Sequence, residues 1–130
     1  MELNMRQRVG LFIILALIAT LVLGFTLIKG KMQHDLWEVC SLAQLAYPQA
    51  TEPVEALLVW IQSPTHSLEE RNRGVWALGH LRDERALSVL EQYYHGGECD
   101  HENEVCQREL KKALNLIKGE GRSLFKLSPP

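Results

Sequence analysis

The sequence predicts an all-α protein with a single N-terminal transmembrane helix and a small helical-repeat domain of about two helix pairs plus a leading helix. Residues 9–28 carry no charged side chain. The rest of the chain places apolar residues at helical spacing and lacks the alternation typical of strands. Part of this helical pattern occurs twice, at offsets of 32 and 36 residues.

These observations divide the chain into five segments. We expect a short N-terminal tail, a transmembrane helix, a connecting helix, a repeat domain and a flexible tail. Their bounds are residues 1–8, 9–28, 29–50, 51–119 and 120–130.

Length and composition exclude several protein classes. A chain of 130 residues allows one small domain and an anchor, which excludes a large two-domain enzyme. The net charge of −2 argues against a strongly basic nucleic-acid binder. Three cysteines are too few for a disulfide-scaffold protein.

The apolar segment reads VGLFIILALIATLVLGFTLI over residues 9–28. A helix of this length spans about 30 Å, the thickness of a bilayer hydrocarbon core. A buried core helix and a cleaved signal peptide are the alternatives. The run is long for either, and no Ala-x-Ala cleavage pattern follows it. We therefore predict an uncleaved membrane anchor that contacts lipid through residues 9–28.

The basic residues on the two sides of this anchor are equal in number and do not favour either orientation. Arg6 and Arg8 precede the apolar segment, and Lys29 and Lys31 follow it. The short leading tail favours a cytoplasmic N-terminus. We expect a single-pass protein of a bacterial inner membrane, with its soluble domain outside the cytoplasm.

Breaking and capping residues delimit the helices that follow the anchor. Gly30 is expected to loosen the join to a helix that starts at Lys31 and ends before Pro48. Thr51 is expected to cap the next helix, which Ser63-Pro64 ends.

Three more helices are expected in the second half of the chain. Ser67 and Glu70 form a capping-box pattern that opens a helix ending at Leu81. Asp83 and Asp100 are expected to cap the last two helices. Gly96-Gly97 ends the first of these and Gly119 ends the second.

The apolar positions repeat between these helices. Val54, Leu57, Leu58 and Ile61 correspond to Ala86, Val89, Leu90 and Tyr93, and Ala77, Leu78 and Leu81 correspond to Ala113, Leu114 and Ile117. Two helix pairs of this kind bury their apolar faces by stacking on each other.

The stretch between Arg71 and Leu90 resembles a HEAT-like repeat of the phycobilisome-lyase type. The fitting positions are Arg71, Ala77, Leu78, Gly79, Leu81, Asp83, Ala86, Leu87 and Leu90. Gly74 stands where the pattern usually has Ala. The resemblance implies stacked helix pairs and a protein-binding or scaffold role. Some relatives assist bilin attachment, so it also implies a weaker alternative, a tetrapyrrole-attachment helper.

No sequence motif indicates catalysis. The chain contains no glycine-rich phosphate loop, no His-Glu-x-x-His and no Gly-x-Ser-x-Gly. We therefore predict a protein that is not an enzyme and has no catalytic residue.

Cysteine and histidine residues gather in one polar segment. Cys99 and Cys106 suit a disulfide in an oxidising compartment, or two free thiols with Cys106 buried. Alternatively, Cys99, His101 and Cys106, with His95 as the candidate fourth ligand, hold zinc or another transition metal. Cys40 lies on an apolar helix face and is predicted to be in the core. If these residues do not bind a metal, no cofactor is expected.

A polar and aromatic stripe marks a candidate partner-binding surface. Arg73, Trp76 and His80 share one helix face, and Glu109 and Lys112 occupy matching positions in the next repeat unit. Trp and Arg dominate the energetics of many interfaces. The alternative is that Trp76 packs against the neighbouring helix and Arg73 is only solvated.

The remaining aromatic and histidine residues are assigned structural or solvent-exposed positions. Trp37 and Trp60 are predicted to pack in the core. His34 and His66 are predicted to be exposed polar residues.

Together these features predict a membrane-anchored, non-enzymatic binding or scaffold element, an accessory subunit of a membrane protein complex. Its partner is expected to be another membrane protein and not a nucleic acid. The alternative is a metal- or redox-responsive assembly factor that uses Cys99, His101 and Cys106.

Overall fold

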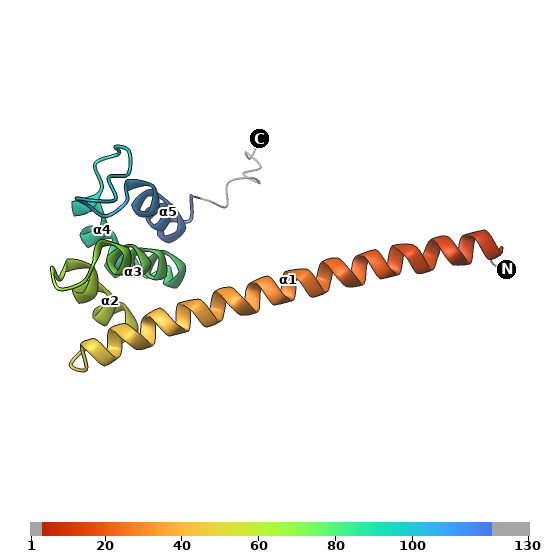
Figure 1. The fold of residues 1–130 in the computed structure, drawn as a ribbon, viewed down its shortest axis with the longest axis horizontal. Coiled ribbons are helices and arrows are strands. Elements are labelled where there is room, and N and C mark those ends of the chain that lie inside the picture. The colour runs from red at the N-terminus through yellow and green to blue at the C-terminus, as the bar shows by residue number, and fades with distance from the viewer. Residues whose placement is uncertain (1–3, 121–130) are drawn as a thin grey trace, which may run out of the picture. The chain divides into compact units, whose positions relative to one another are not determined.

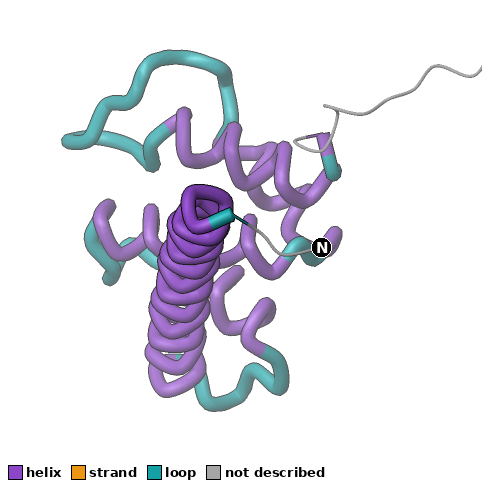
Figure 2. The backbone as a smooth tube through the Cα atoms, turned by 90° about the vertical axis from the view of Figure 1, so that its right-hand side faces the viewer, coloured by secondary structure: helices purple, strands orange, loops and turns teal. Residues whose placement is uncertain are grey.

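A computed structural model describes residues 4–120, and all regular elements in this range are helical (Figures 1 and 2). The elements are α1 (Met5–Ala46), α2 (Pro53–Gln62), α3 (Leu68–Leu81), the 3-10 helix η1 (Glu84–Ala86), α4 (Leu87–Tyr93) and α5 (Gln107–Lys118). The predicted all-α fold class is confirmed. The chain divides into two compact units between Asp35 and Leu36.

Helix α1 is longer and more continuous than predicted. It starts at Met5, inside the expected N-terminal tail, and passes through Gly30 without a break. The expectation that Gly30 loosens the chain is therefore wrong. A single glycine costs about 1 kcal/mol in a helix interior but keeps its N–H donor, so it does not end the helix. The helix ends at Ala46, before Pro48 as predicted.

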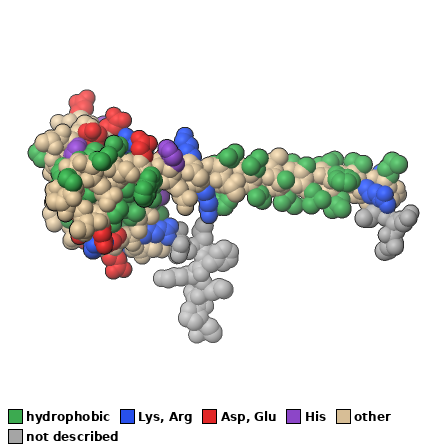
Figure 3. Space-filling view, turned by 90° about the horizontal axis from the view of Figure 1, so that it is seen from below, with side chains coloured by type: hydrophobic (Ala, Val, Ile, Leu, Met, Phe, Trp, Pro, Cys, Tyr) green, Lys and Arg blue, Asp and Glu red, His purple; other side chains and the backbone are tan. Residues whose placement is uncertain are grey.

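The apolar part of α1 presents its side chains outward. Exposure of its large hydrophobic residues ranges from 49% at Leu11 to 74% at Leu21, and Figure 3 shows hydrophobic side chains around this part of the helix. Thr20 and Thr26 donate their hydroxyls to carbonyls three residues earlier, at 2.8 Å each. By length and composition this helix is able to cross a membrane.

In the second unit, α3 packs against both α2 and α5. Two glycines of α3 allow these contacts. A Cβ added at Gly74 would lie 2.7 Å from Ile61 Cγ2 of α2, and one at Gly79 would lie 2.7 Å from Ala113 Cα of α5. Gly74 therefore departs from the repeat pattern for a steric reason, and Gly79 allows the close crossing of α3 and α5.

Several predicted helix caps are present. The Ser67 hydroxyl accepts from the Glu70 N–H at 3.2 Å, and the Glu70 carboxylate accepts from the Ser67 N–H at 2.7 Å. The hydrogen bond from the Ser67 backbone N–H, followed by that from the Ser67 hydroxyl, holds the pKa of the Glu70 carboxylate below its usual value. Asp83 accepts from the Arg85 N–H at the start of η1. Gly119 ends α5 with a left-handed backbone, at φ 73°.

Two expected N-terminal caps are wrong, and α4 ends at Tyr93, before the expected Gly96-Gly97. Thr51 donates its N–H and hydroxyl to the Glu55 carboxylate, and Glu52 precedes the first residue of α2. Asp100 caps only a local turn by accepting from the Glu102 and Asn103 N–H groups. Helix α5 therefore starts later, at Gln107.

The core of the second unit comes from every helix in it. Its fully buried large side chains are Leu57, Ile61, Val75, Leu78, Leu90, Gln107 and Leu110. Cys40 is 4% exposed, as predicted, and burial raises the pKa of its thiol. Trp60 is also buried as predicted, whereas Trp37 is 71% exposed, so its predicted core position is wrong. It lies on the side of α1 opposite the buried Val39 and Ala43.

Arg71, the arginine of the repeat pattern, joins three helices of this unit. It belongs to α3, and its Nε donates to the Ile61 carbonyl of α2 at 2.6 Å. Its guanidinium lies 5.6 Å from the ring centroid of Tyr93 in α4. The side chain thus both donates a hydrogen bond to a carbonyl in the last turn of α2 and packs on an aromatic face.

Candidate functional site

A groove of about 230 Å³ lies between α3 and α5. We call it the α3–α5 groove. Its lining residues are Trp76, His80, Glu109, Lys112, Ala113 and Leu116. Four of the five residues predicted to bind a partner are therefore brought together here, although they are about 30 positions apart in sequence.

The α3 side of the groove is an ordered aromatic pair. The rings of Trp76 and His80 are tilted by 39° with centroids 4.5 Å apart. His80 Nδ1 is 2.9 Å from the Trp76 carbonyl oxygen, which fixes the imidazole one turn after the indole. Both side chains are half-buried, so each retains surface for contact with another molecule.

The α5 side of the groove combines an ion pair with an apolar floor. Lys112 Nζ donates to Glu109 Oε1 at 2.8 Å, and the lysine side chain is 61% exposed. Ala113 is buried and Leu116 half-buried. Ala113 is also the residue closest to Gly79, so the groove lies directly over the close crossing of the two helices.

Arg73 is not part of this groove. Its Nη2 lies 3.7 Å from Glu38 Oε1 of α1, and both side chains are half exposed. The i, i+3, i+7 spacing placed Arg73 on the same helix face as Trp76 and His80, but this ion pair directs its guanidinium toward α1.

The polar segment between α4 and α5, residues 94–106, forms the disulfide loop. Cys99 and Cys106 are joined by a disulfide with their Cα atoms 4.6 Å apart. This is the first of the three alternatives predicted for these cysteines. Cys99 is half-buried, whereas Cys106 is 2% exposed and directly precedes α5.

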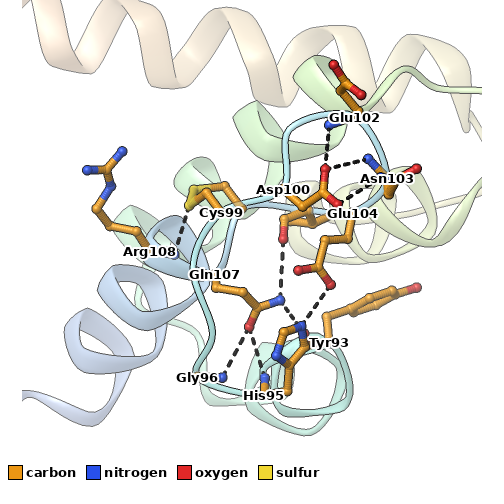
Figure 4. Close-up of polar contacts among 12 residues, drawn as sticks. Tyr93, His95, Gly96, Cys99, Asp100, Glu102, Asn103, Glu104, Gln107 and Arg108 are labelled. Atoms are coloured by element: carbon orange, nitrogen blue, oxygen red, sulfur yellow. Dashed lines mark hydrogen bonds and ion pairs between the residues drawn. A yellow bond between two sulfur atoms is a disulfide. The ribbon is translucent and has the colours of Figure 1, made fainter.

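Gln107 anchors the disulfide loop from the start of α5 (Figure 4). Its Oε1 accepts from the His95 and Gly96 N–H groups, and its Nε2 donates to the Tyr93 carbonyl at 3.0 Å. Gln107 is the buried polar residue of the core, and the sequence analysis missed it. Its spacing of three and seven residues from Leu110 and Leu114, which places it on the apolar face of α5, is the signal that could have identified it.

The loop histidines and cysteines form a partial metal-ligand set. His101 lies within 4.8 Å of both cysteine sulfurs. His95, the proposed fourth ligand, is instead paired with Glu104 at 2.8 Å. A thiolate, not a disulfide sulfur, is the metal ligand, so metal binding here would require the disulfide to be reduced.

His66 makes contacts beside α2 that were not predicted from the sequence. His66 stacks on Trp60, with centroids 3.7 Å apart, and its Nε2 is 3.0 Å from the Tyr47 hydroxyl. Its Nδ1 lies 3.8 Å from Glu70, and its side chain is only 15% exposed. The expectation of a freely exposed His66 is therefore wrong. Because these contacts come from three separate segments, helical spacing could not predict them. His34 is exposed, as predicted.

Comparison with known proteins identifies one repeat. Residues 70–94 match the PBS lyase HEAT-like repeat family. This match covers most of α3, the following corner, η1 and α4, and confirms the resemblance seen in the sequence. No curated protein and no solved structure matches the chain.

Proposed function

We propose that this chain is a membrane-anchored, non-enzymatic binding element that holds a segment of another membrane protein in its α3–α5 groove. The observation that carries this proposal is the convergence of Trp76, His80, Glu109 and Lys112 on one groove. HEAT-like repeats form protein-interaction surfaces, and the matched repeat includes the α3 wall of this groove.

The size of the groove favours a side chain of a protein over a cofactor. Small-molecule pockets usually enclose about 300–1,000 Å³. The groove encloses about 230 Å³. Its indole and leucine suit an apolar side chain, and the Glu109–Lys112 pair at its rim suits a neighbouring polar group of the same segment. Trp is also enriched among residues that dominate binding energy.

The apolar part of α1 supports the anchoring role. Exposing one large apolar side chain to water costs about 1.5–3 kcal/mol, so a helix that exposes many of them is stable in lipid. Anchoring confines the domain to the membrane plane and raises the effective concentration of a membrane-bound partner. The Cys99–Cys106 disulfide supports a domain outside the cytoplasm, because disulfides persist in oxidising compartments.

Alkaline extraction of membranes tests the anchor. We expect the full-length protein to stay in the membrane pellet with residues 9–28 present by mass spectrometry. A soluble product that lacks these residues would show a cleaved signal sequence and would overturn the anchoring role.

Replacing Trp76 tests the groove. In gentle detergent, Trp76→Ala should lose most of the co-purifying partner, since a buried interface tryptophan is commonly worth 2 kcal/mol or more, about 30-fold in affinity. Helicity should remain, because Trp76 is only half-buried. Val59→Ala is the matched control, as Val59 is 42% exposed on α2 and does not line the groove. Equal binding by both variants would place the interface elsewhere.

A further inference from the structure

The Cys99–Cys106 disulfide is accessible from one side only. Cys99 lines a cavity of about 500 Å³ beside the disulfide loop. The other lining residues are Tyr94, Gly96, Gly97, Glu98, His101, Gln107, Arg108 and Lys111. Cys106 does not line this cavity and is 2% exposed. A reagent entering the cavity therefore reaches Cys99 Sγ and not Cys106 Sγ.

The surroundings of the disulfide favour negative charge on sulfur. The backbone N–H of Arg108 donates to Cys99 Sγ at 3.4 Å, as the dashed line in Figure 4 shows. Arg108 and Lys111 line the cavity, where Glu98 is the acidic residue. Cys106 occupies the N-terminal cap of α5, where backbone N–H groups stabilise an anion. Reactive cysteines occur in electropositive, partly exposed settings of this kind.

The loop does not depend on the disulfide alone for its conformation. Gln107 holds the chain at Tyr93, His95 and Gly96. The Cys106 N–H donates to Asn72 Oδ1 of α3 at 2.8 Å. The disulfide closes a loop with a sequence separation of only 7, so it constrains the unfolded chain less than a disulfide that closes a long loop. The bond can therefore open while α5 stays in place.

We propose that the Cys99–Cys106 bond is a thiol–disulfide exchange site for an incoming thiolate, with Cys99 the attacked sulfur and Cys106 the leaving sulfur. The thiolate bonds to Cys99 Sγ while the Cys99–Cys106 bond breaks and its electron pair leaves on Cys106 Sγ. A second thiolate of the donor then attacks the donor sulfur in the mixed disulfide and releases Cys99. The donor loses two electrons and becomes a disulfide. Its two protons pass to Cys99 and Cys106.

This activity is separate from partner binding in the α3–α5 groove. The residues that line the cavity and those that line the groove do not overlap. A groove variant such as Trp76→Ala therefore tests the proposed function without altering the exchange site. The two proposals can fail independently.

Single-cysteine reactivity tests the assignment of the two sulfurs. Full-length Cys106→Ser and Cys99→Ser, in detergent, are mixed with oxidised glutathione, and adducts are located by peptide mass spectrometry. We expect Cys99 to form its mixed disulfide at least about tenfold faster than Cys106, since Cys99 lines the cavity whereas Cys106 is 2% exposed. Equal rates, or faster reaction of Cys106, would overturn the assignment.

Reduction of the native bond tests the activity and the donor. The wild-type protein is incubated with reduced glutathione or with a thioredoxin-type protein dithiol, then acid-quenched and alkylated. Reduction by glutathione would identify a low-molecular-weight thiol as sufficient. Reduction by the protein dithiol alone would identify a protein donor. Either outcome supports the site if helicity is unchanged. Resistance to both reagents, or reduction only with loss of helicity, would show a structural bond and overturn the proposal.

A charge-reversal variant tests whether the incoming thiol reaches Cys99 through this cavity. Lys111→Glu should slow reduction by the anionic glutathione severalfold. Lys31→Glu makes the same charge change on α1, outside the lining of the cavity, and should not slow it. Equal rates for the two variants would contradict approach through this cavity.

Discussion

Gly79 shows how one residue determines the geometry of the candidate site. An added Cβ would meet the backbone of Ala113, at 2.7 Å from its Cα, and backbone yields less readily than the end of a flexible side chain. The distance between α3 and α5, and therefore the width of the groove between them, depends on the absence of a side chain at this position.

Gly79→Ala should therefore lower the free energy of unfolding by about 1–3 kcal/mol, the usual cost of overpacking. Thermal unfolding of the full-length protein in detergent, followed by circular dichroism, measures this change. Gly30→Ala is the control, because no heavy atom lies within 4 Å of the added Cβ. That variant should gain up to about 1 kcal/mol from helix propensity. A stabilised Gly79→Ala would contradict the close crossing.

The capping box at the start of α3 should make stability depend on pH. The Ser67 N–H, followed by the Ser67 hydroxyl, lowers the pKa of Glu70 from its ordinary value of 4.5. A lowered pKa means that the carboxylate stabilises the folded state above 4.5, and that this contribution is lost as pH falls through the lowered pKa.

Glu70→Gln should thus reduce stability at neutral pH and flatten the acid side of the pH profile. Chemical unfolding between neutral and acidic pH measures both effects. Glu69→Gln is the matched control, since Glu69 also lies in the first turn of α3 but outside the capping box. A pH profile unchanged by Glu70→Gln would contradict the role of the carboxylate.

Individual residues also show which contacts could be predicted from the sequence and which could not. Ser67, Gly79 and Gly119 were predictable because caps and close crossings have local signals. The hydrogen bonds of Gln107 to His95 and of His66 to Tyr47 were not, because these partners lie 12 and 19 residues away and their positions depend on how the helices pack. Trp37 was misplaced because helical spacing alone does not say which face of a lone helix finds a partner.

At the scale of elements, most helices were predicted from the sequence, and the Cys99–Cys106 disulfide was one of three predicted alternatives, but the conformation of the disulfide loop was not predicted. The bounds of α3 and the end of α5 follow from capping residues. The start of α5 was placed too early because Asp100 has the chemistry of a cap but uses it in a turn. What fixes the loop is Gln107, whose amide replaces the missing helical hydrogen bonds.

Gln107→Leu tests this account of the loop. The variant keeps an apolar side chain in the core but leaves the His95 N–H and the Tyr93 carbonyl without their amide partner. Both groups are only part-buried, so each one left unpaired costs at most about 1–3 kcal/mol. Hydrogen exchange should therefore show loss of protection at His95 and Gly96, while Asn103→Ala, on the exposed part of the loop, should leave it unchanged. Protection retained in Gln107→Leu would show that another contact fixes the loop.

On the scale of the whole molecule, an apolar helix and a helical-repeat unit occur in one short chain. The sequence predicted both parts, because one depends on composition and the other on a repeated pattern. It also predicted four of the residues that line the α3–α5 groove, since equivalent positions of stacked repeats meet in space. It could not predict that Arg73 pairs with Glu38, a contact made with a helix outside the repeat pattern.

Site-specific photo-crosslinking in intact membranes tests the central claim most directly. A photo-reactive residue in place of Lys112 lies at the groove rim, and one in place of Ser88 lies on the exposed surface of α4. We predict that position 112 crosslinks to a discrete membrane protein, that position 88 does not, and that Trp76→Ala abolishes the adduct. Equal crosslinking at both positions, or an adduct that survives Trp76→Ala, would contradict a partner held in the α3–α5 groove.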